Sequence, residues 1–190
     1  MIQKPKLSAS RIEVSDSVED FYELVLENRW GDGLPVIPPT EERVMKMFAG
    51  LDRKPSDVTG GMPPSNNDVT IEKIAVNAVM AGCLPEYMPI LIAAVEAMIE
   101  PSFNLHGIQA TTSPVAPLVI VNGPIRGKVN LNCGRGCFGP GWRANATIGR
   151  AIRFLLINIG GALSGDVDMA TYGSPAKYTF CIGEDEENSP

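Results

Sequence analysis

The residues best suited to chemistry gather between Asn132 and Arg153, in a glycine-rich segment that leads into an apolar helical pattern. Cys133 and Cys137 bracket a Gly-Arg-Gly sequence there. A loop beside arginines and just before a helix N-terminus favours the thiolate form of cysteine, which is the nucleophilic and redox-active form. We therefore predict Cys137 as a nucleophilic or redox thiol, assisted by His106 or by Cys133. Either cysteine could instead pack as a small apolar side chain, and the Cys-x3-Cys spacing is not the Cys-x2-Cys of thioredoxin-like proteins.

The same segment carries features of an anion-binding site. Its five glycines let the backbone approach a ligand closely, and the helix that follows offers free N–H groups at its N-terminus. Arginine binds carboxylate or phosphate through paired hydrogen bonds. The Gly-Lys-Ser/Thr end of a P-loop and the glycine spacing of a dinucleotide fingerprint are both missing. We expect substrate contacts from Arg135, Trp142, Arg143, Asn145 and Arg150.

His106 is the only histidine, so any histidine-based acid–base catalysis near neutral pH must use it. A structural, hydrogen-bonded histidine is the alternative. A zinc site from His106, Cys133, Cys137 and Cys181 is conceivable, but the sequence lacks the two tight ligand pairs of such sites. We expect Cys181, in an apolar strand pattern, and Cys83, after a helix, to belong to the core.

Charge is unevenly distributed along the chain. The net charge is −6, yet residues 101–165 contain six Lys and Arg residues and no Asp or Glu. The cations of this acid-free segment are Arg126, Lys128, Arg135, Arg143, Arg150 and Arg153. Because buried arginines need partners, either the acidic flanks dock onto this segment or an anionic ligand does. The sequence leaves both alternatives open.

Composition limits the class of protein. The 190 residues, 44% of them hydrophobic, suffice for one domain with a core, with an extended arm over residues 1–15 and a solvated acidic tail over 184–190. We expect a cytoplasmic protein, since no signal peptide or membrane-spanning run is visible and four cysteines do not suggest a disulfide framework. The acidic balance argues against nucleic acid as a partner.

Helical patterns come before strand patterns in the chain. We expect helices over 17–28, 41–49, 70–81, 86–100 and 145–159, and strands over 103–112, 117–122, 129–132 and 178–182. Residues 50–68 are expected to form a loop, and 117–122, a continuous apolar run, a strand buried on both faces. The order predicts an α+β fold in which N-terminal helices are followed by a small sheet packed around a buried, arginine-striped helix.

Several runs also suggest a family. The runs WGDGLPVIPPT, NAVMAGCLPEYMP, PLVIVNGPI, GCFGPGWRANATIGRAIR and KYTFCI resemble bacterial proteins related to the UGSC-type (seleno)proteins. The Sec/Cys-Gly-Ser-Cys motif of that family is absent here. The resemblance implies thiol or selenol redox chemistry, and a reactive centre completed by a partner subunit, but it transfers no catalytic residue.

Three functions remain in competition. The leading hypothesis is an enzyme, or a subunit of one, that uses a cysteine thiol as an oxidoreductase or lyase on a small carboxylate or thioester. The alternatives are a metal-dependent lyase or hydrolase with Cys and His ligands, and a non-catalytic subunit that binds an acidic partner chain. We expect a homo- or hetero-oligomer, because the arm and two largely apolar helices offer more apolar surface than one small domain buries. The sequence identifies no cofactor.

Overall fold

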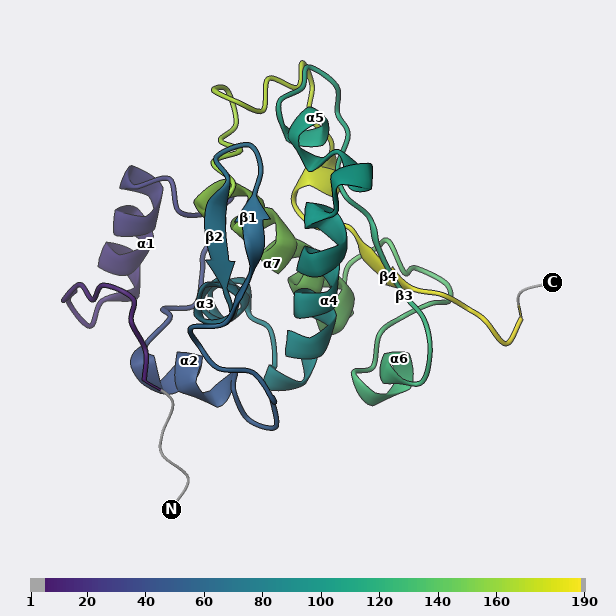
Figure 1. The fold of residues 1–190 in the computed structure, drawn as a ribbon, viewed down its shortest axis with the longest axis horizontal. Helices are drawn as coiled ribbons and strands as arrows, with labels where there is room; N and C mark the ends of the chain where they lie inside the picture. Colours follow the sequence, from purple (N-terminus) through teal and green to yellow (C-terminus); the bar gives the residue numbers. More distant parts are fainter. Residues whose placement is uncertain (1–5, 189–190) are drawn as a thin grey trace.

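The computed structural model describes residues 6–188. Its longest helix, α7 (Arg143–Asn158), lies in the interior and packs against α3 (Ile71–Ala81), α4 (Met88–Ile99) and β4 (Cys181–Gly183) (Figure 1). The predicted α+β class and the central arginine-bearing helix are confirmed: helices dominate, and the strands form two separate two-stranded sheets. The helix begins at Arg143, slightly before the expected start.

The predicted N-terminal helices form because their first turns are capped. α1 (Val18–Glu27) and α2 (Glu41–Lys46) follow Ser17 and Thr40, whose side chains accept hydrogen bonds from main-chain N–H groups of the first turn, as Thr70 does for α3. Gly82 ends α3 in the left-handed conformation that glycine adopts without strain. The short 3-10 helix η1 (Pro85–Tyr87) leads into α4.

The prediction of a loop over residues 50–68 is wrong. β1 (Val58–Met62) and β2 (Asn67–Thr70) form an antiparallel hairpin there, which packs on α4 (Figure 1). The run Gly60-Gly61 hides the alternation by which strands are recognised. It also permits a close approach, because a Cβ at Gly60 would lie 2.6 Å from Ile99 Cδ1.

The strand expected over 103–112 is also wrong. The segment forms the 3-10 helix η2 (Pro101–Phe103) and the helix α5 (Leu105–Gln109). Asn104 adopts a left-handed backbone between them, and its side chain accepts a hydrogen bond from Gly107 N–H. This cap starts a helix too short to show a helical period in the sequence.

The second sheet is smaller than expected. β3 (Val119–Val121) pairs in parallel with β4, and Ile120 is 56% exposed, so the strand is not buried on both faces. Residues 129–132 are not a strand. They follow the short helix α6 (Ile125–Lys128) as irregular chain. Of the expected strand 178–182, pairing begins only at Cys181, after the 3-10 helix η3 (Pro175–Lys177).

The N-terminal arm is held by a buried carboxylate. Residues 6–17 form no helix or strand, as predicted, and residues 1–5 of the predicted arm lie outside the described part. Glu72, 2% exposed in the first turn of α3, accepts hydrogen bonds from the N–H groups of Ser8 and Ala9 and from the Ser8 hydroxyl. These bonds fix the arm against α3 rather than leaving it extended in solvent.

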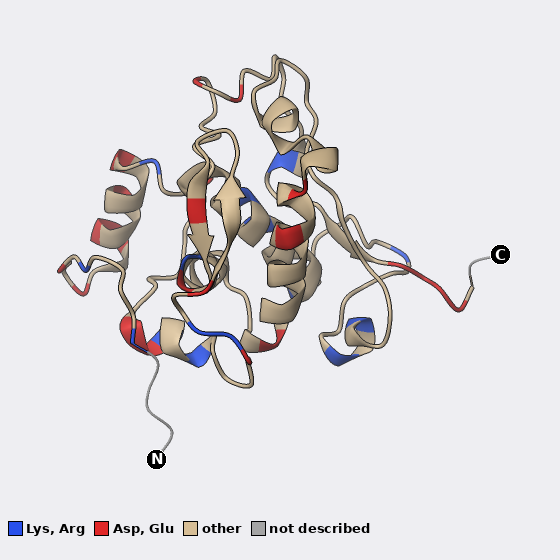
Figure 2. Ribbon diagram, in the orientation of Figure 1, with Lys and Arg blue, Asp and Glu red and all other residues tan. Residues whose placement is uncertain are grey.

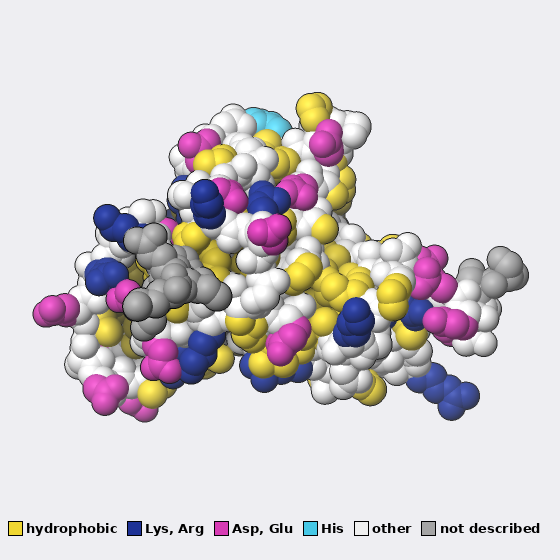
Figure 3. Space-filling model, turned by 60° about the horizontal axis from the view of Figure 1, so that its bottom comes forward, with side chains coloured by type: hydrophobic (Ala, Val, Ile, Leu, Met, Phe, Trp, Pro, Cys, Tyr) yellow, Lys and Arg dark blue, Asp and Glu magenta, His cyan; other side chains and the backbone are white. Residues whose placement is uncertain are grey.

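In Figure 2, acidic residues mark α1, α2, β2 and α4 as well as the C-terminal segment, and none lies on α7. On the face drawn in Figure 3, Lys and Arg side chains are interspersed with Asp and Glu, with apolar side chains between them. This face therefore carries no extended field of one sign. Within residues 6–188, no single helix has the length and apolar composition to cross a membrane. The ranges Pro85–Ile99 and Pro101–Gln109 meet that test only as a pair, bent by 73°.

Candidate functional site

A buried asparagine closes the loop that carries the two candidate cysteines. Asn145, 4% exposed in the first turn of α7, accepts a hydrogen bond from Asn132 N–H (2.9 Å) and donates to the carbonyls of Asn132 (2.9 Å) and Cys137 (3.2 Å). One side chain therefore ties together the chain just before Cys133 and the chain at Cys137. The predicted site residue Asn145 thus positions the loop.

Cys133 has a cationic neighbour that the sequence did not assign to the site. Arg126 Nη1, from α6, lies 3.5 Å from Cys133 Sγ. Cys133 is half-buried between this guanidinium and β4, where a Cβ at Gly183 would lie 3.0 Å from Cys133 Cβ. The sulfur therefore has an arginine N–H donor beside it. Arg126 stands seven residues before Cys133, and only the turn at α6 brings them together.

The acidic tail folds back onto Arg126. Glu187 and Glu186 contact Arg126 Nη2 at 2.5 and 3.2 Å, and the Glu184 carbonyl accepts from Nη1. The tail, predicted as solvated, is exposed but attached, since Gly123 N–H also donates to Glu186 (2.7 Å). The hydrogen bond from Arg126 lowers the pKa of Glu187 below its usual value and raises the pKa of Arg126 in turn.

Cys137 occupies the turn of the loop and is half-buried. Its N–H donates to the Gly134 carbonyl at 3.2 Å. The neighbouring Phe138 is 64% exposed, and its ring centroid lies 5.5 Å from that of Phe180. Trp142, a predicted substrate contact, is also exposed at the far end of the loop. The thiol loop, residues 132–142, therefore presents aromatic surface to solvent.

Two predicted substrate-binding arginines flank this loop. Arg135 lies in its turn and is exposed. Arg143, the first residue of α7, donates from Nε (3.0 Å) and Nη2 (2.9 Å) to the Gly82 carbonyl at the end of α3. Within residues 6–188, neither guanidinium has a carboxylate within ion-pair distance. Both keep a full positive charge for an anion.

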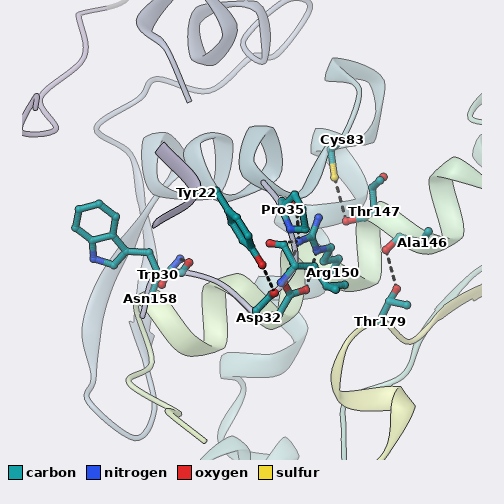
Figure 4. A network of polar contacts seen from close by, with 12 residues as sticks. Tyr22, Trp30, Asp32, Pro35, Cys83, Ala146, Thr147, Arg150, Asn158 and Thr179 are labelled. Atoms are coloured by element: carbon teal, nitrogen blue, oxygen red, sulfur yellow. Dashed lines mark hydrogen bonds and ion pairs between the residues drawn. The ribbon is translucent and has the colours of Figure 1, made fainter. Parts of the chain in front are cut away.

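The other arginines of α7 bind carboxylates of the chain itself. Arg150, predicted as a substrate contact, pairs with Asp32 through two hydrogen bonds of 2.7 and 2.9 Å and lies over the ring of Phe154 (Figure 4). Arg153 Nη2 lies 3.1 Å from Asp168. With Arg126 bound to the tail, three of the six cations of the acid-free segment are neutralised by the acidic flanks. That is the first of the two alternatives that the sequence left open.

His106 does not join the cysteines. It is exposed on α5 and, among the described residues, makes no side-chain hydrogen bond or ion pair with Cys133 or Cys137. Within residues 6–188, no group of three or more His, Cys, Asp or Glu side chains is placed to hold a metal ion. The geometry therefore offers no cysteine–histidine ligand set to the metal-dependent alternative.

Cys83 and Cys181 are core residues, as predicted. Cys83 is 7% and Cys181 4% exposed, and burial raises the pKa of each thiol to about 12. Cys83 Sγ donates to the Thr147 carbonyl at 3.2 Å (Figure 4). The raised pKa keeps both thiols protonated, and therefore unreactive, at neutral pH.

No family model, curated protein or solved structure matches this chain.

Proposed function

We propose that this protein is a thiol-dependent enzyme, or a subunit of one, in which Cys133 and Cys137 exchange electrons with a small anionic organic substrate. The single observation that carries the proposal is the pair of contacts around the loop. Asn145 binds the main chain of Cys137 and of Asn132, the residue before Cys133, and Arg126 contacts Cys133 Sγ. The same thiol chemistry is what the resemblance to UGSC-type relatives implies.

The roles of the two cysteines follow from their neighbours. Cys133, whose sulfur accepts a hydrogen bond from Arg126, is the attacking thiol, and Cys137 is the resolving thiol; this reverses the order expected from the sequence. Cys133 attacks a substrate disulfide, forms a mixed disulfide and releases one thiolate. Cys137 then attacks Cys133 sulfur, which releases the second thiolate and leaves a Cys133–Cys137 disulfide. Two electrons pass from the dithiol to the substrate.

The surroundings of the loop favour an anionic, partly aromatic or aliphatic substrate. Arg135 and Arg143 are cations without a carboxylate partner in the described part of the chain, and a guanidinium binds carboxylate strongly. Phe138 and Trp142 add exposed aromatic surface beside them. A disulfide that carries a carboxylate combines these two features.

The first test is alkylation with iodoacetamide at neutral pH, with each of the four cysteines followed by mass spectrometry. We expect Cys133 to react much faster than Cys83 and Cys181, whose raised pKa keeps them as thiols up to strongly alkaline pH. Arg126→Met should slow Cys133 alone. Lys128→Met, which removes an exposed cation from the same short helix, is the matched control and should change nothing.

The second test distinguishes a dithiol pair from two independent thiols. The aromatic dicarboxylate disulfide 5,5′-dithiobis(2-nitrobenzoate) should release a second equivalent of thiolate as the Cys133–Cys137 disulfide forms. Cys137→Ser should stop at the stable mixed disulfide on Cys133. Stable adducts on both cysteines of the unmodified protein, or equal alkylation of all four thiols, would refute the proposal.

A further inference from the structure

A second potential site lies outside the thiol loop, in a cavity of about 770 Å³ next to the C-terminal half of α7. Its walls come from α1, from the turn at residues 31–33 and from residues 163–178. None of the four cysteines lines it. Its size is that of an ordinary small-molecule site.

Three buried charges form one side of the cavity. Asp168 Oδ2 accepts from Lys177 Nζ at 2.7 Å and from Arg153 Nη2 at 3.1 Å. The side chains of Asp168, Arg153 and Lys177 are 2%, 10% and 12% exposed. One carboxylate therefore faces two cations. Burying a charge without a partner is unfavourable, so this arrangement leaves one positive charge to be compensated.

The remaining charged residues around the cavity do not supply the compensation. Arg29 pairs with Asp166 at 2.6 Å, and Asp32 pairs with Arg150 at 2.7 Å. Each of these pairs is neutral. The Asp32–Arg150 pair is drawn in Figure 4, where Asp32 points towards the guanidinium rather than away from it. The surplus charge thus stays with Lys177 and Arg153.

Lys177 is the cation with donors to spare. Arg153 already donates to the Gln109 side chain and the Ala162 carbonyl as well as to Asp168. A lysine ammonium has three N–H donors, and within residues 6–188 the only hydrogen bond of Lys177 Nζ is to Asp168. An anion in the cavity could therefore accept from Lys177 without breaking the Asp168 contacts.

The other lining residues define what the anion is attached to. Val25, Leu26, Ile157 and Leu163 supply an apolar wall, and Tyr172 and Tyr178 stand exposed at the cavity. Such a wall binds hydrocarbon and excludes a strongly hydrated ion. We propose that this cavity binds a small apolar monocarboxylate, with the carboxylate on Lys177 Nζ and the hydrocarbon part against α1 and α7.

The test compares acids with their neutral amides by calorimetry on the intact protein. We expect benzoate and hexanoate to bind, and benzamide and hexanamide to bind at least about tenfold more weakly, the loss of a charge-assisted hydrogen bond. Lys177→Met should weaken benzoate about as much, whereas Lys177→Arg should retain it. Lys128→Met, which removes an exposed charge away from the cavity, is the control.

The outcomes are decisive even where a variant misfolds. Lys177→Met leaves a one-to-one Arg153–Asp168 pair, so the variant should fold; if it does not, the comparison of acid with amide on the unmodified protein still decides. Equal affinity for acid and amide, no binding of either acid at millimolar concentration, or unchanged binding by Lys177→Met overturns the proposal. Lys177→Met should leave the alkylation rate of Cys133 unchanged, so this site and the thiol loop fail or succeed separately.

Discussion

Gly149 provides a sharp test of how α7 is seated against the C-terminal segment. It is buried in the middle of the helix, and a Cβ there would lie 2.4 Å from both Phe180 N and Thr179 Oγ1. The Thr179 hydroxyl donates to the Ala146 carbonyl at 2.7 Å (Figure 4). Gly149→Ala must therefore push the 179–180 backbone away from α7 and break that hydrogen bond.

The size of the effect follows from three contributions. Overpacking in a core costs about 1–3 kcal/mol, and the lost hydrogen bond about 1 kcal/mol. Alanine in place of glycine stabilises a helix by about 1 kcal/mol, which opposes these two losses. The net destabilisation of Gly149→Ala is then about 1–3 kcal/mol, which lowers Tm by roughly 2–12 °C in a domain of this length.

Thermal unfolding followed by circular dichroism measures this change. Gly127→Ala is the matched control, because Gly127 lies in α6 with nothing within 4 Å of its Cβ position, so only the helix-favouring contribution of alanine remains. We expect its Tm to equal or exceed that of the unmodified protein. If Gly149→Ala is as stable as Gly127→Ala, then α7 and the 179–180 segment are not in the contact described here.

Two further predictions concern charged groups. Asp32→Asn removes the carboxylate from the buried Arg150 pair and should lower the free energy of unfolding, measured by chemical denaturation, by about 2–4 kcal/mol. Asp166→Asn breaks an exposed pair with Arg29 and should lower it by less than about 1 kcal/mol. Equal losses in the two variants would contradict the burial of the Asp32–Arg150 pair. The Arg126 hydrogen bond lowers the pKa of Glu187 in the folded protein, so tail attachment should be complete above the usual glutamate range and lost as the pH falls through the lowered pKa. The pH dependence of the Glu187 side-chain carboxyl resonance measures this, and its midpoint should rise towards the ordinary glutamate range in Arg126→Met.

The helices that the sequence predicted are those whose signals are local. Ser17, Thr40 and Thr70 lie within three residues of the N–H groups that they cap, and Gly82 ends its helix by its own backbone conformation. The hairpin at 58–70 has no such signal. Gly60 fits against Ile99, which lies some forty residues later, so only the tertiary contact explains the strand.

The sequence indicates which segment could carry the candidate site, but it does not indicate which residues contact one another there. The segment from Asn132 to Arg153 contains the two cysteines and Asn145, which binds the main chain of Asn132 and Cys137. The partner of Arg150 stands 118 residues away, and the cation beside Cys133 comes from a four-residue helix that no periodicity predicts. Nothing in the sequence indicated the Lys177–Asp168 ion pair, because a lysine nine residues after an aspartate matches no motif and the two meet only in the folded chain.

The pairing of charges also changes where an anion should be sought. The acid-free segment suggested that its arginines together form the binding surface. Arg126, Arg150 and Arg153, however, each form an ion pair with a carboxylate of this chain. An arginine whose charge is balanced by a carboxylate attracts a free substrate anion less strongly, although its remaining N–H groups still donate, as Arg126 Nη1 does to Cys133. Binding should therefore respond to substitution at Arg143 and Lys177, whose cations keep donors in reserve, and the paired arginines should respond in stability instead. The helix α7 thus carries two kinds of arginine: Arg150 and Arg153 are paired with carboxylates, whereas Arg143 binds the Gly82 carbonyl and has no carboxylate partner among the described residues.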